Sequence, residues 1–282
     1  MLGDVVETLA CPHCGADLAG DAAGLRCTAG HSFDVARQGY VNLLTGTGST
    51  GTADTAAMVA ARVDFLGAGH YDRLGDTLAA ACAGEVPGVL VDVGAGTGHH
   101  LARVLDALAE RRGLALDISK YALRRAARAH PRMGAAVCDA WRPLPVRGGA
   151  AARVLNVFAP RNPPELHRIL AADGTLIVAA PTPRHLGELV PALDLLQVDP
   201  DKQERIDAKL APWFTVRARE TVTWTMALDH AAVAGVVAMG PSAWHTDPDL
   251  LRARIAALAD PLAVTASISV SVYDPVRRLP NC

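Results

Sequence analysis

This sequence of 282 residues has few aromatic residues and few lysines, and its acidic and basic residues nearly balance. Only 4% of the residues are Phe, Trp or Tyr, so the core must be built mainly from Ala, Val and Leu. Lysine supplies only three of the 27 basic residues, and the formal net charge is −2. A near-neutral chain excludes a histone-like polycation, although a local basic patch can still bind nucleic acid.

The sequence also lacks long apolar runs. None reaches the length of about 18 to 20 residues that a membrane-spanning helix needs. The first residues, MLGDVVETLACPHC, have no basic start followed by a long apolar block, so we expect no secretory signal. These absences predict a cytoplasmic protein that does not bind a membrane. Six cysteines without a secretory signal indicate a reducing compartment, where closely spaced cysteine pairs more often bind metal than form disulfides.

A metal site is predicted near the amino terminus. Cys11 and Cys14 form a C-x-x-C pair, and Cys27 and His31 follow it in the next 17 residues. Thiolate and imidazole ligands at this spacing favour a closed, structural zinc site. A segment of roughly 40 residues buries too little surface to fold alone, so we expect a bound metal to stabilise its fold. His13 is a competing ligand that we rank lower, because its place between two cysteines makes convergence awkward.

The rest of the chain has the pattern of an α/β protein. Residues 45–55 are small and polar, which predicts a flexible linker, and residues 56–83 have helical apolar spacing that is interrupted around Gly67. After Pro87, short apolar runs alternate with amphipathic stretches, an order that predicts a parallel sheet with helices on both faces. The last third adds strands at one edge of the sheet. The expected strands are 89–91, 114–116, 135–138, 153–157, 174–180, 214–227 and 264–273, and the expected helices are 99–111, 119–130 and 163–171.

A glycine-rich loop follows the first of these strands. The residues that we assign to it as ligand contacts are Asp92, Gly94, Gly96, Thr97 and Gly98. The glycines allow a tight turn and a close approach of a ligand to the backbone. The dinucleotide fingerprint G-x-G-x-x-G would place its third glycine at position 99, which is a histidine, so a nicotinamide cofactor is disfavoured.

This loop resembles motif I of the S-adenosylmethionine-dependent methyltransferases. That cofactor has a cationic sulfonium and an amino-acid tail but no phosphate, so a carboxylate such as Asp92 beside the loop is useful. Asp117 ends the next strand, where a carboxylate can accept bonds from both ribose hydroxyls. Asp139 ends the third strand, where methyltransferases often hold the adenine amino group, although a helix cap or a surface turn is a plainer role for it.

Further short stretches carry a more specific resemblance. They are CPHC at 11–14, GHSFD at 30–34, GYVNLL at 39–44, AR at 61–62, FL at 65–66, AGHY at 68–71, LDISK at 116–120, FAP at 158–160, PRHL at 183–186 and MGPSAW at 239–244. Over nearly its full length the chain resembles the bacterial 23S rRNA guanine-N1 methyltransferases of the RlmA type. One departure is Arg161-Asn162, where the family carries Cys-Lys.

The resemblance implies a fold, ligands and a domain organisation. We expect a zinc-binding RNA-recognition module at 1–44, a linker and helical segment at 45–85, and a Rossmann-like class I methyltransferase domain at 86–282. The family's zinc ligands fall on Cys11, Cys14, Cys27 and His31. Its cofactor contacts fall on Tyr71, Gly96-Thr97 and His185; from the residues alone, Tyr71 would be a packing residue and His185 a helix-start residue.

The resemblance also implies an activity. The expected enzyme transfers a methyl group from S-adenosylmethionine to N1 of guanine 745 or 748, in standard rRNA numbering, in a 23S rRNA hairpin near the peptide exit tunnel. One branch of the family is associated with macrolide resistance such as that to tylosin. RNA affinity must come from local charge, and Arg26 and Arg37 of the zinc module are the better candidates for holding the hairpin. The run of arginines at 124, 125, 128 and 132 is more simply a solvated helix face. A homodimer is left open.

The chemistry sets requirements for the site. N1 of guanine lies on the Watson–Crick edge and carries a proton, so the target base must be unpaired or flipped out. Asn156 at the end of the fourth strand and Trp244 are the candidate catalytic contacts to this base. The proton acceptor is left open among three groups beside the glycine loop, which are His99, His100 and Asp92.

Two other functions remain open at this stage. One is a methyltransferase of the same fold that acts on a small molecule or a protein. The other is a non-catalytic, zinc-dependent RNA-binding protein that retains a cofactor domain. Methylation of 23S rRNA fragments distinguishes the rRNA methyltransferase from one that acts on a small molecule or a protein. Affinity for S-adenosylmethionine distinguishes the enzyme from the non-catalytic RNA-binding protein.

Overall fold

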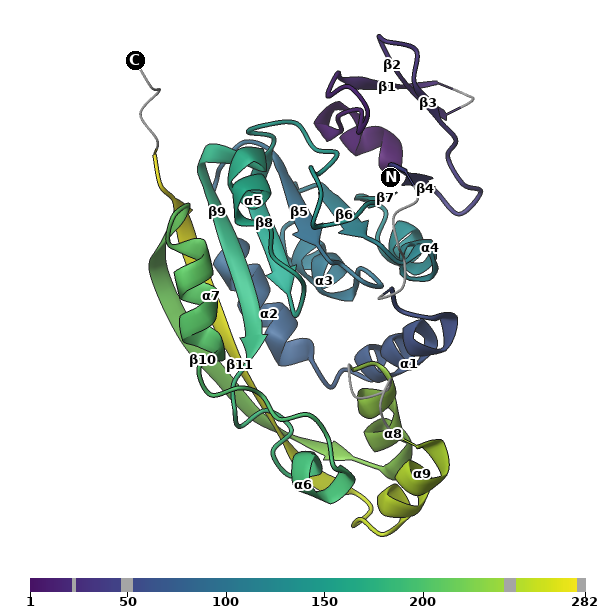
Figure 1. Ribbon diagram of the computed structural model, residues 1–282, viewed down its shortest axis with the longest axis vertical. Coiled ribbons are helices and arrows are strands. Elements are labelled where there is room, and N and C mark those ends of the chain that lie inside the picture. The colour runs from purple at the N-terminus through teal and green to yellow at the C-terminus, as the bar shows by residue number, and fades with distance from the viewer. Residues whose placement is uncertain (22–23, 47–52, 241–246, 278–282) are drawn as a thin grey trace.

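The structure, a computed structural model, describes residues 1–21, 24–46, 53–240 and 247–277. Its centre is an eight-stranded sheet (Figure 1). The strands in spatial order are β10 (Phe214–Leu228), β11 (Leu262–Pro275), β9 (Leu170–Pro181), β8 (Ala151–Val157), β5 (Val89–Val93), β6 (Gly113–Asp117), β7 (Met133–Val137) and β4 (Tyr40–Asn42). From β9 to β4 neighbouring strands are parallel, whereas β11 is antiparallel to both β9 and β10. The predicted parallel sheet with extra strands at one edge is confirmed.

Helices cover both faces of this sheet, as predicted. On one face lie α2 (Asp72–Cys82), α3 (His99–Ala107) and α4 (Lys120–Ala129), and on the other lie α5 (Pro163–Ile169) and α7 (Lys202–Leu210). Leu90 packs with the first group and its neighbour Val91 with the second. This alternation follows from the period of two in a strand, which sends successive side chains to opposite faces. The central strands are therefore buried on both sides, which is why they appear in the sequence as continuous apolar runs.

The remaining helices follow α1 (Ala56–Gly67) in a row of contacts, in which α8 (His230–Ala238) packs on α1, α9 (Pro248–Ala256) on α8 and α6 (Leu189–Leu193) on α9. The predicted break after Gly67 separates α1 from α2, as expected. The predicted helix at 99–111 ends earlier, at Ala107, and the side chain of Arg111 then bonds to the carbonyls of Gly84 and Val86. No helix among the described residues is both long enough and apolar enough to cross a membrane.

The amino-terminal segment forms a small layer against the sheet. It contains a 3-10 helix, η1 (Leu2–Thr8), and an antiparallel sheet of β1 (Leu18–Asp21), β2 (Gly24–Cys27) and β3 (Ser32–Phe33). Leu18 and Leu25 belong to the same buried cluster as Val91 of the large sheet. The chain then enters the large sheet through β4, where Tyr40 pairs with Ala135. The domain boundaries at residues 44 and 85 stay predictions.

The topology indicates where a ligand binds. From β5, the chain goes to β6 and β7 on one side and to β8 and β9 on the other. The strand order thus reverses between β5 and β8, and ligands of open α/β sheets bind at the carboxyl ends of the strands at such a point. Asp92, the glycine turn and Asn156 all lie there.

Candidate functional site

The predicted zinc ligands converge in the structure. The ligand atoms of Cys11, Cys14, Cys27 and His31 all lie within 4.8 Å of one another. Nδ1 of His31 is 3.5 Å from Sγ of Cys11 and 3.4 Å from Sγ of Cys27, and the sulfurs of Cys14 and Cys27 are 3.7 Å apart. A Zn–S bond of about 2.3 Å places tetrahedral sulfurs about 3.8 Å apart, so the set fits zinc.

Two tight turns bring these ligands together. Gly15 and Gly30 have φ values of 74° and 87°, which glycine adopts without strain. Their amides donate to the carbonyls of Cys11 and Cys27 at 2.8 and 3.0 Å, closing each turn around its ligand pair. His13 lies outside the set, with its ring stacked at 5.9 Å on that of Phe33.

The glycine turn joins β5 to α3. Gly94, Gly96 and Gly98 all have positive φ, at 82°, 54° and 76°. A Cβ at Gly94 would lie 2.3 Å from Cβ of Ala159, and one at Gly98 would lie 3.0 Å from Ala126. Two of these glycines are therefore required by packing, whereas among the described residues only the Arg62 side chain lies within 4 Å of a Cβ added at Gly96. Gly96 is the place where the backbone is open to a ligand.

The acidic residues beside the turn differ in what they contact. Asp117 accepts from the amides of Gly96 and Ser119, both at 2.8 Å, so it fixes the turn as well as ending β6. Burial raises its pKa, and the two amide bonds oppose that rise. Asp92 is buried, and burial followed by the charge of Asp117 raises its pKa to about 8. Asp139 accepts from the amide of Trp141 at 2.9 Å, which is the surface-turn role considered for it.

Tyr71 and His185 meet across 114 residues of sequence. Oη of Tyr71 lies 3.1 Å from Nε2 of His185. The amide of Ser267 donates to Nδ1 of His185 at 3.3 Å, so a neutral imidazole carries its proton on Nε2 and donates it to Tyr71. Burial, and then the charge of Lys202, lowers the pKa of His185 to about 4, so the ring is neutral at pH 7. The Tyr71 hydroxyl proton is then free for another acceptor.

Phe158 completes this aromatic group. Its ring stacks on His185 at 6.2 Å and lies 6.3 Å from Tyr71, and its φ is 53°. It is also 39% exposed, which is unusual for a phenylalanine in a strained backbone position. A base or an adenine ring could stack on this exposed face.

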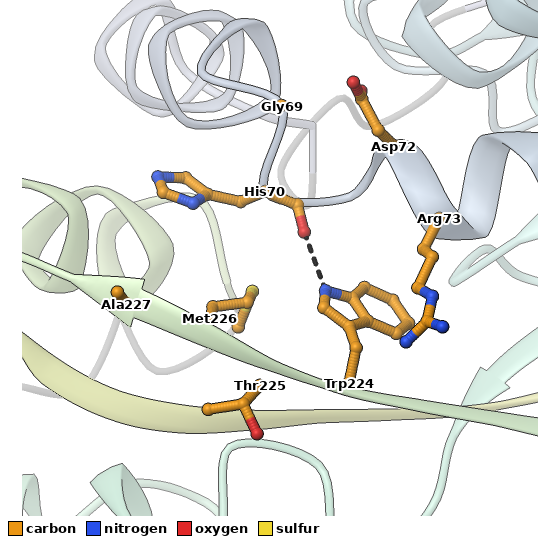
Figure 2. Close-up of a pocket in the computed structure, with 8 residues that line it drawn as sticks. All are labelled: Gly69, His70, Asp72, Arg73, Trp224, Thr225, Met226 and Ala227. Carbon is orange, nitrogen blue, oxygen red and sulfur yellow. Dashed lines mark hydrogen bonds between the residues drawn. The ribbon is translucent and has the colours of Figure 1, made fainter.

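A pocket lies beside Trp224, which also contacts Tyr71 (Figure 2). Its volume is about 370 Å³, and it lies between the turn at Gly69–Arg73 and the Trp224–Ala227 stretch of β10. Nε1 of Trp224 donates to the carbonyl of His70 at 3.0 Å, and the Trp224 ring meets Tyr71 edge-on at 5.8 Å. Trp224 thus links this pocket to Tyr71.

Of the two candidate catalytic residues, the structure describes only Asn156. Asn156 is fully buried, and its Nδ2 donates to the carbonyls of Val93 at 3.1 Å and Pro160 at 2.8 Å. It ties the glycine turn to the segment after β8. Trp244 lies outside the described residues.

Several buried polar atoms around the turn have no hydrogen-bond partner within the described part of the chain. They are Arg62 Nε, Asp92 Oδ1, His99 Nε2, His100 Nδ1 and Asn156 Oδ1. Buried polar groups are normally paired, so a cluster of unpaired ones indicates that a polar ligand satisfies them. The unpaired atoms include both donors and acceptors. An amino-acid tail needs both, because its carboxylate accepts hydrogen bonds and its ammonium donates them. The residues present therefore fit S-adenosylmethionine.

Comparison with known proteins gives the family. The RlmA amino-terminal zinc ribbon domain matches residues 9–45. Over 280 residues the chain is 52% identical to the 23S rRNA (guanine(748)-N(1))-methyltransferase of Streptomyces fradiae, covering 98% of this chain and 100% of that protein. It is 51% identical over 293 residues to a Micromonospora griseorubida protein provisionally named a 23S rRNA (guanine-N(1)-)-methyltransferase, covering 97% and 99%.

One solved structure supports the fold. An Anabaena variabilis protein, provisionally named a methyltransferase from an antibiotic biosynthesis pathway, has a TM-score of 0.51 and 16% identity, covering 72% of this chain and 97% of that one. The sheet, its switch point and the glycine turn thus define a class I methyltransferase that uses S-adenosylmethionine. The chain belongs to the family of the 23S rRNA (guanine-N1)-methyltransferases, and its amino-terminal ribbon is a structural zinc site. The predicted family, fold and cofactors are confirmed.

Proposed function

We propose that this enzyme transfers the methyl group of S-adenosylmethionine to N1 of guanine 748 in 23S rRNA, in the bacterial cytoplasm. The observation that carries this proposal is the 52% identity over the whole length of the relative named for that guanine. Of the two guanines that the sequence left open, this likeness favours 748 over 745. Protection of the ribosome against macrolides such as tylosin would be the physiological consequence.

A methyl group on N1 blocks the Watson–Crick edge, so the product is detected as a stop in reverse transcription. Purified protein, S-adenosylmethionine and unmethylated 23S rRNA should give a new stop next to guanine 748, and omitting the donor should remove it. A stop next to guanine 745 would reassign the target, and the absence of any stop would overturn the proposal.

We assign the cofactor to the glycine turn and its neighbours. Gly96 and Thr97 supply backbone contacts, Gly94 and Gly98 shape the turn, and Asp117 accepts from the ribose hydroxyls. Asp139 is assigned to the adenine, Asp92 to the cationic end, and Tyr71 with His185 to the amino-acid tail. What supports this set is that the Gly96 amide donates to Asp117, that Tyr71 contacts His185, and that Asp92 and both histidines after the turn carry unpaired buried atoms.

Replacing Asp117 with alanine should weaken binding of S-adenosylhomocysteine at least tenfold, which is about 1.4 kcal/mol. The ribose would lose its acceptor, and the amides of Gly96 and Ser119 would lose theirs. Isothermal titration calorimetry gives the affinity. Asp106→Ala, on the exposed side of α3, is the control and should change nothing. Equal affinities in the wild type and Asp117→Ala would show that the ribose lies elsewhere.

The mechanism requires the target base to be held and its proton removed. We propose that Asn156 and Trp244 contact the guanine. The pKa of His100 is lowered to about 3 by burial and then by the charge of His99, and burial also lowers that of His99. Both imidazoles are neutral at pH 7, whereas Asp92 is largely protonated when no cation lies beside it and is engaged with the cofactor when one does. The N1 proton becomes acidic as the nitrogen takes the methyl group, so a weak neutral base suffices, and we favour a histidine over Asp92. Orientation of the two reactants supplies much of the rate.

The RNA is proposed to lie on the zinc module and the adjacent helix face. Arg26 and Arg37 are exposed on the module. On α4, Arg124, Arg125 and Arg128 are exposed, and none of them makes an ion pair with a described residue. These cations are free to meet phosphates, which position a duplex without reading its sequence. A homodimer stays part of the proposal, and light scattering of the purified chain tests it.

A further inference from the structure

Arg62 reaches the glycine turn from outside the β-α pattern. It lies on α1, and its side chain is three-quarters buried. A Cβ at Gly96 would lie 3.6 Å from Arg62 Cδ and 3.9 Å from its Nε. The guanidinium therefore lies over the one glycine of the turn that packing leaves open.

The arginine is held rigidly in this position. Its Nη2 donates to Oδ2 of Asp54 at 2.7 Å and to the carbonyl of Met239 at 2.9 Å. The Asp54 carbonyl in turn accepts from Oγ of Ser119 at 2.8 Å, just beyond Asp117. A guanidinium held by two other segments of the chain loses little further entropy when it binds a ligand.

One edge of this guanidinium is left without a partner. Nε of Arg62 is buried and makes no hydrogen bond to any described residue. An ionised donor that is buried without an acceptor is costly, so its presence beside an open glycine indicates that a ligand supplies the acceptor. An anionic acceptor fits best, because hydrogen bonds between a guanidinium and a carboxylate are about twice as strong as neutral ones.

We propose that Arg62 binds the carboxylate of the cofactor's amino-acid tail through its Nε. This inference rests on the proposed methyltransferase function and adds a residue to its cofactor site. Arg62 selects for the tail, whereas the ribose and adenine contacts at Asp117 and Asp139 do not depend on it. A purely structural arginine would instead support the turn as a whole and affect every part of the cofactor equally.

Two ligands separate these roles. S-adenosylhomocysteine carries the tail, and 5′-methylthioadenosine keeps the adenosine and sulfur but has no carboxylate. Calorimetry on Arg62→Met should show S-adenosylhomocysteine binding weakened by tenfold to a hundredfold, with methylthioadenosine binding unchanged within twofold. Loss of both affinities by the same factor, or loss of neither, would overturn the proposal.

Arg254→Met is the matched control. Nη1 of Arg254 also has one carboxylate partner, Asp194 at 3.7 Å, and one backbone partner, the carbonyl of Leu193 at 3.1 Å, but it lies on α9 away from the turn. Its substitution should leave both affinities unchanged. If Arg62→Met does not fold, the wild type itself gives the test: decarboxylated S-adenosylmethionine should bind at least tenfold more weakly than S-adenosylmethionine, and equal binding would contradict the inference. A wild type that binds neither nucleoside would overturn the proposed function instead.

Discussion

Replacing Gly94 with alanine is expected to destabilise the fold by about 2 to 5 kcal/mol and to weaken cofactor binding more than tenfold. Two costs add at this position. The φ of 82° is a left-handed conformation that costs an L-residue about 1 to 2 kcal/mol. The new Cβ would also lie 2.3 Å from Cβ of Ala159, and overpacking of this kind costs about 1 to 3 kcal/mol.

The damage should extend to the cofactor site because of what Ala159 adjoins. The chain after β8 passes from Phe158, which stacks on His185, to Pro160, whose carbonyl is held by Asn156. A shift of Ala159 away from the glycine turn therefore displaces both the aromatic group and the Asn156 bonds. Urea unfolding measures the stability, and calorimetry with S-adenosylhomocysteine measures the binding.

Two further variants separate strain from collision. Gly149→Ala has a similar φ of 71°, and no atom of the described part of the chain lies within 4 Å of the added Cβ, so it should lose only about 1 to 2 kcal/mol and keep its cofactor affinity. Adding Ala159→Gly to Gly94→Ala removes the colliding carbon and should restore most of the binding. If the double variant binds no better than Gly94→Ala, the contact between these two segments does not shape the site.

The strands and the metal ligands were predictable because their signals are local. A strand buried on both faces, such as β5, is a short apolar run in the sequence, and the ends of β10 and β11 fall within a few residues of those predicted. The spacing of the four zinc ligands likewise lies within one short segment.

The rest of the site depends on contacts between distant segments. Tyr71 and His185 lie on different elements, and without the family resemblance each would have been assigned a packing or helix-start role. Nothing in the local sequence distinguishes Arg62 from other arginines, and its contact with Gly96 follows only from the position of α1 in the fold. The helices α6 to α9 were not predicted either; α8, for example, is alanine- and valine-rich on all sides and shows no amphipathic period. The strand β4 joins the large sheet by pairing in parallel with β7, which lies nearly a hundred residues later in the chain. No local sequence pattern specifies this pairing.

Replacing Cys14 with serine should remove zinc and unfold the ribbon while leaving the cofactor site in place. Serine is a poor zinc ligand, and the other three atoms would leave the coordination incomplete. Zinc supplies about 10 to 16 kcal/mol of apparent binding free energy in zinc-finger peptides at pH 7, so a ribbon of this size should not stay folded without it. Metal analysis of the purified protein should show the ion lost, and amide exchange should rise across residues 9–33.

The ribbon's contacts with the sheet decide how far the unfolding extends. Leu18 and Leu25 pack in the same cluster as Val91, whereas the glycine turn is held by Asp117, Asn156 and the opposite helices. We therefore expect S-adenosylhomocysteine affinity to fall less than threefold and methylation of 23S rRNA to be lost, because the RNA-binding surface goes with the metal. His13→Ala is the control, since this ring stacks on Phe33 outside the ligand set and should leave the zinc bound. If Cys14→Ser keeps its zinc, or if His13→Ala loses it, the ligand assignment is wrong. If Cys14→Ser loses cofactor affinity together with the metal, the ribbon supports the glycine turn through the shared buried cluster.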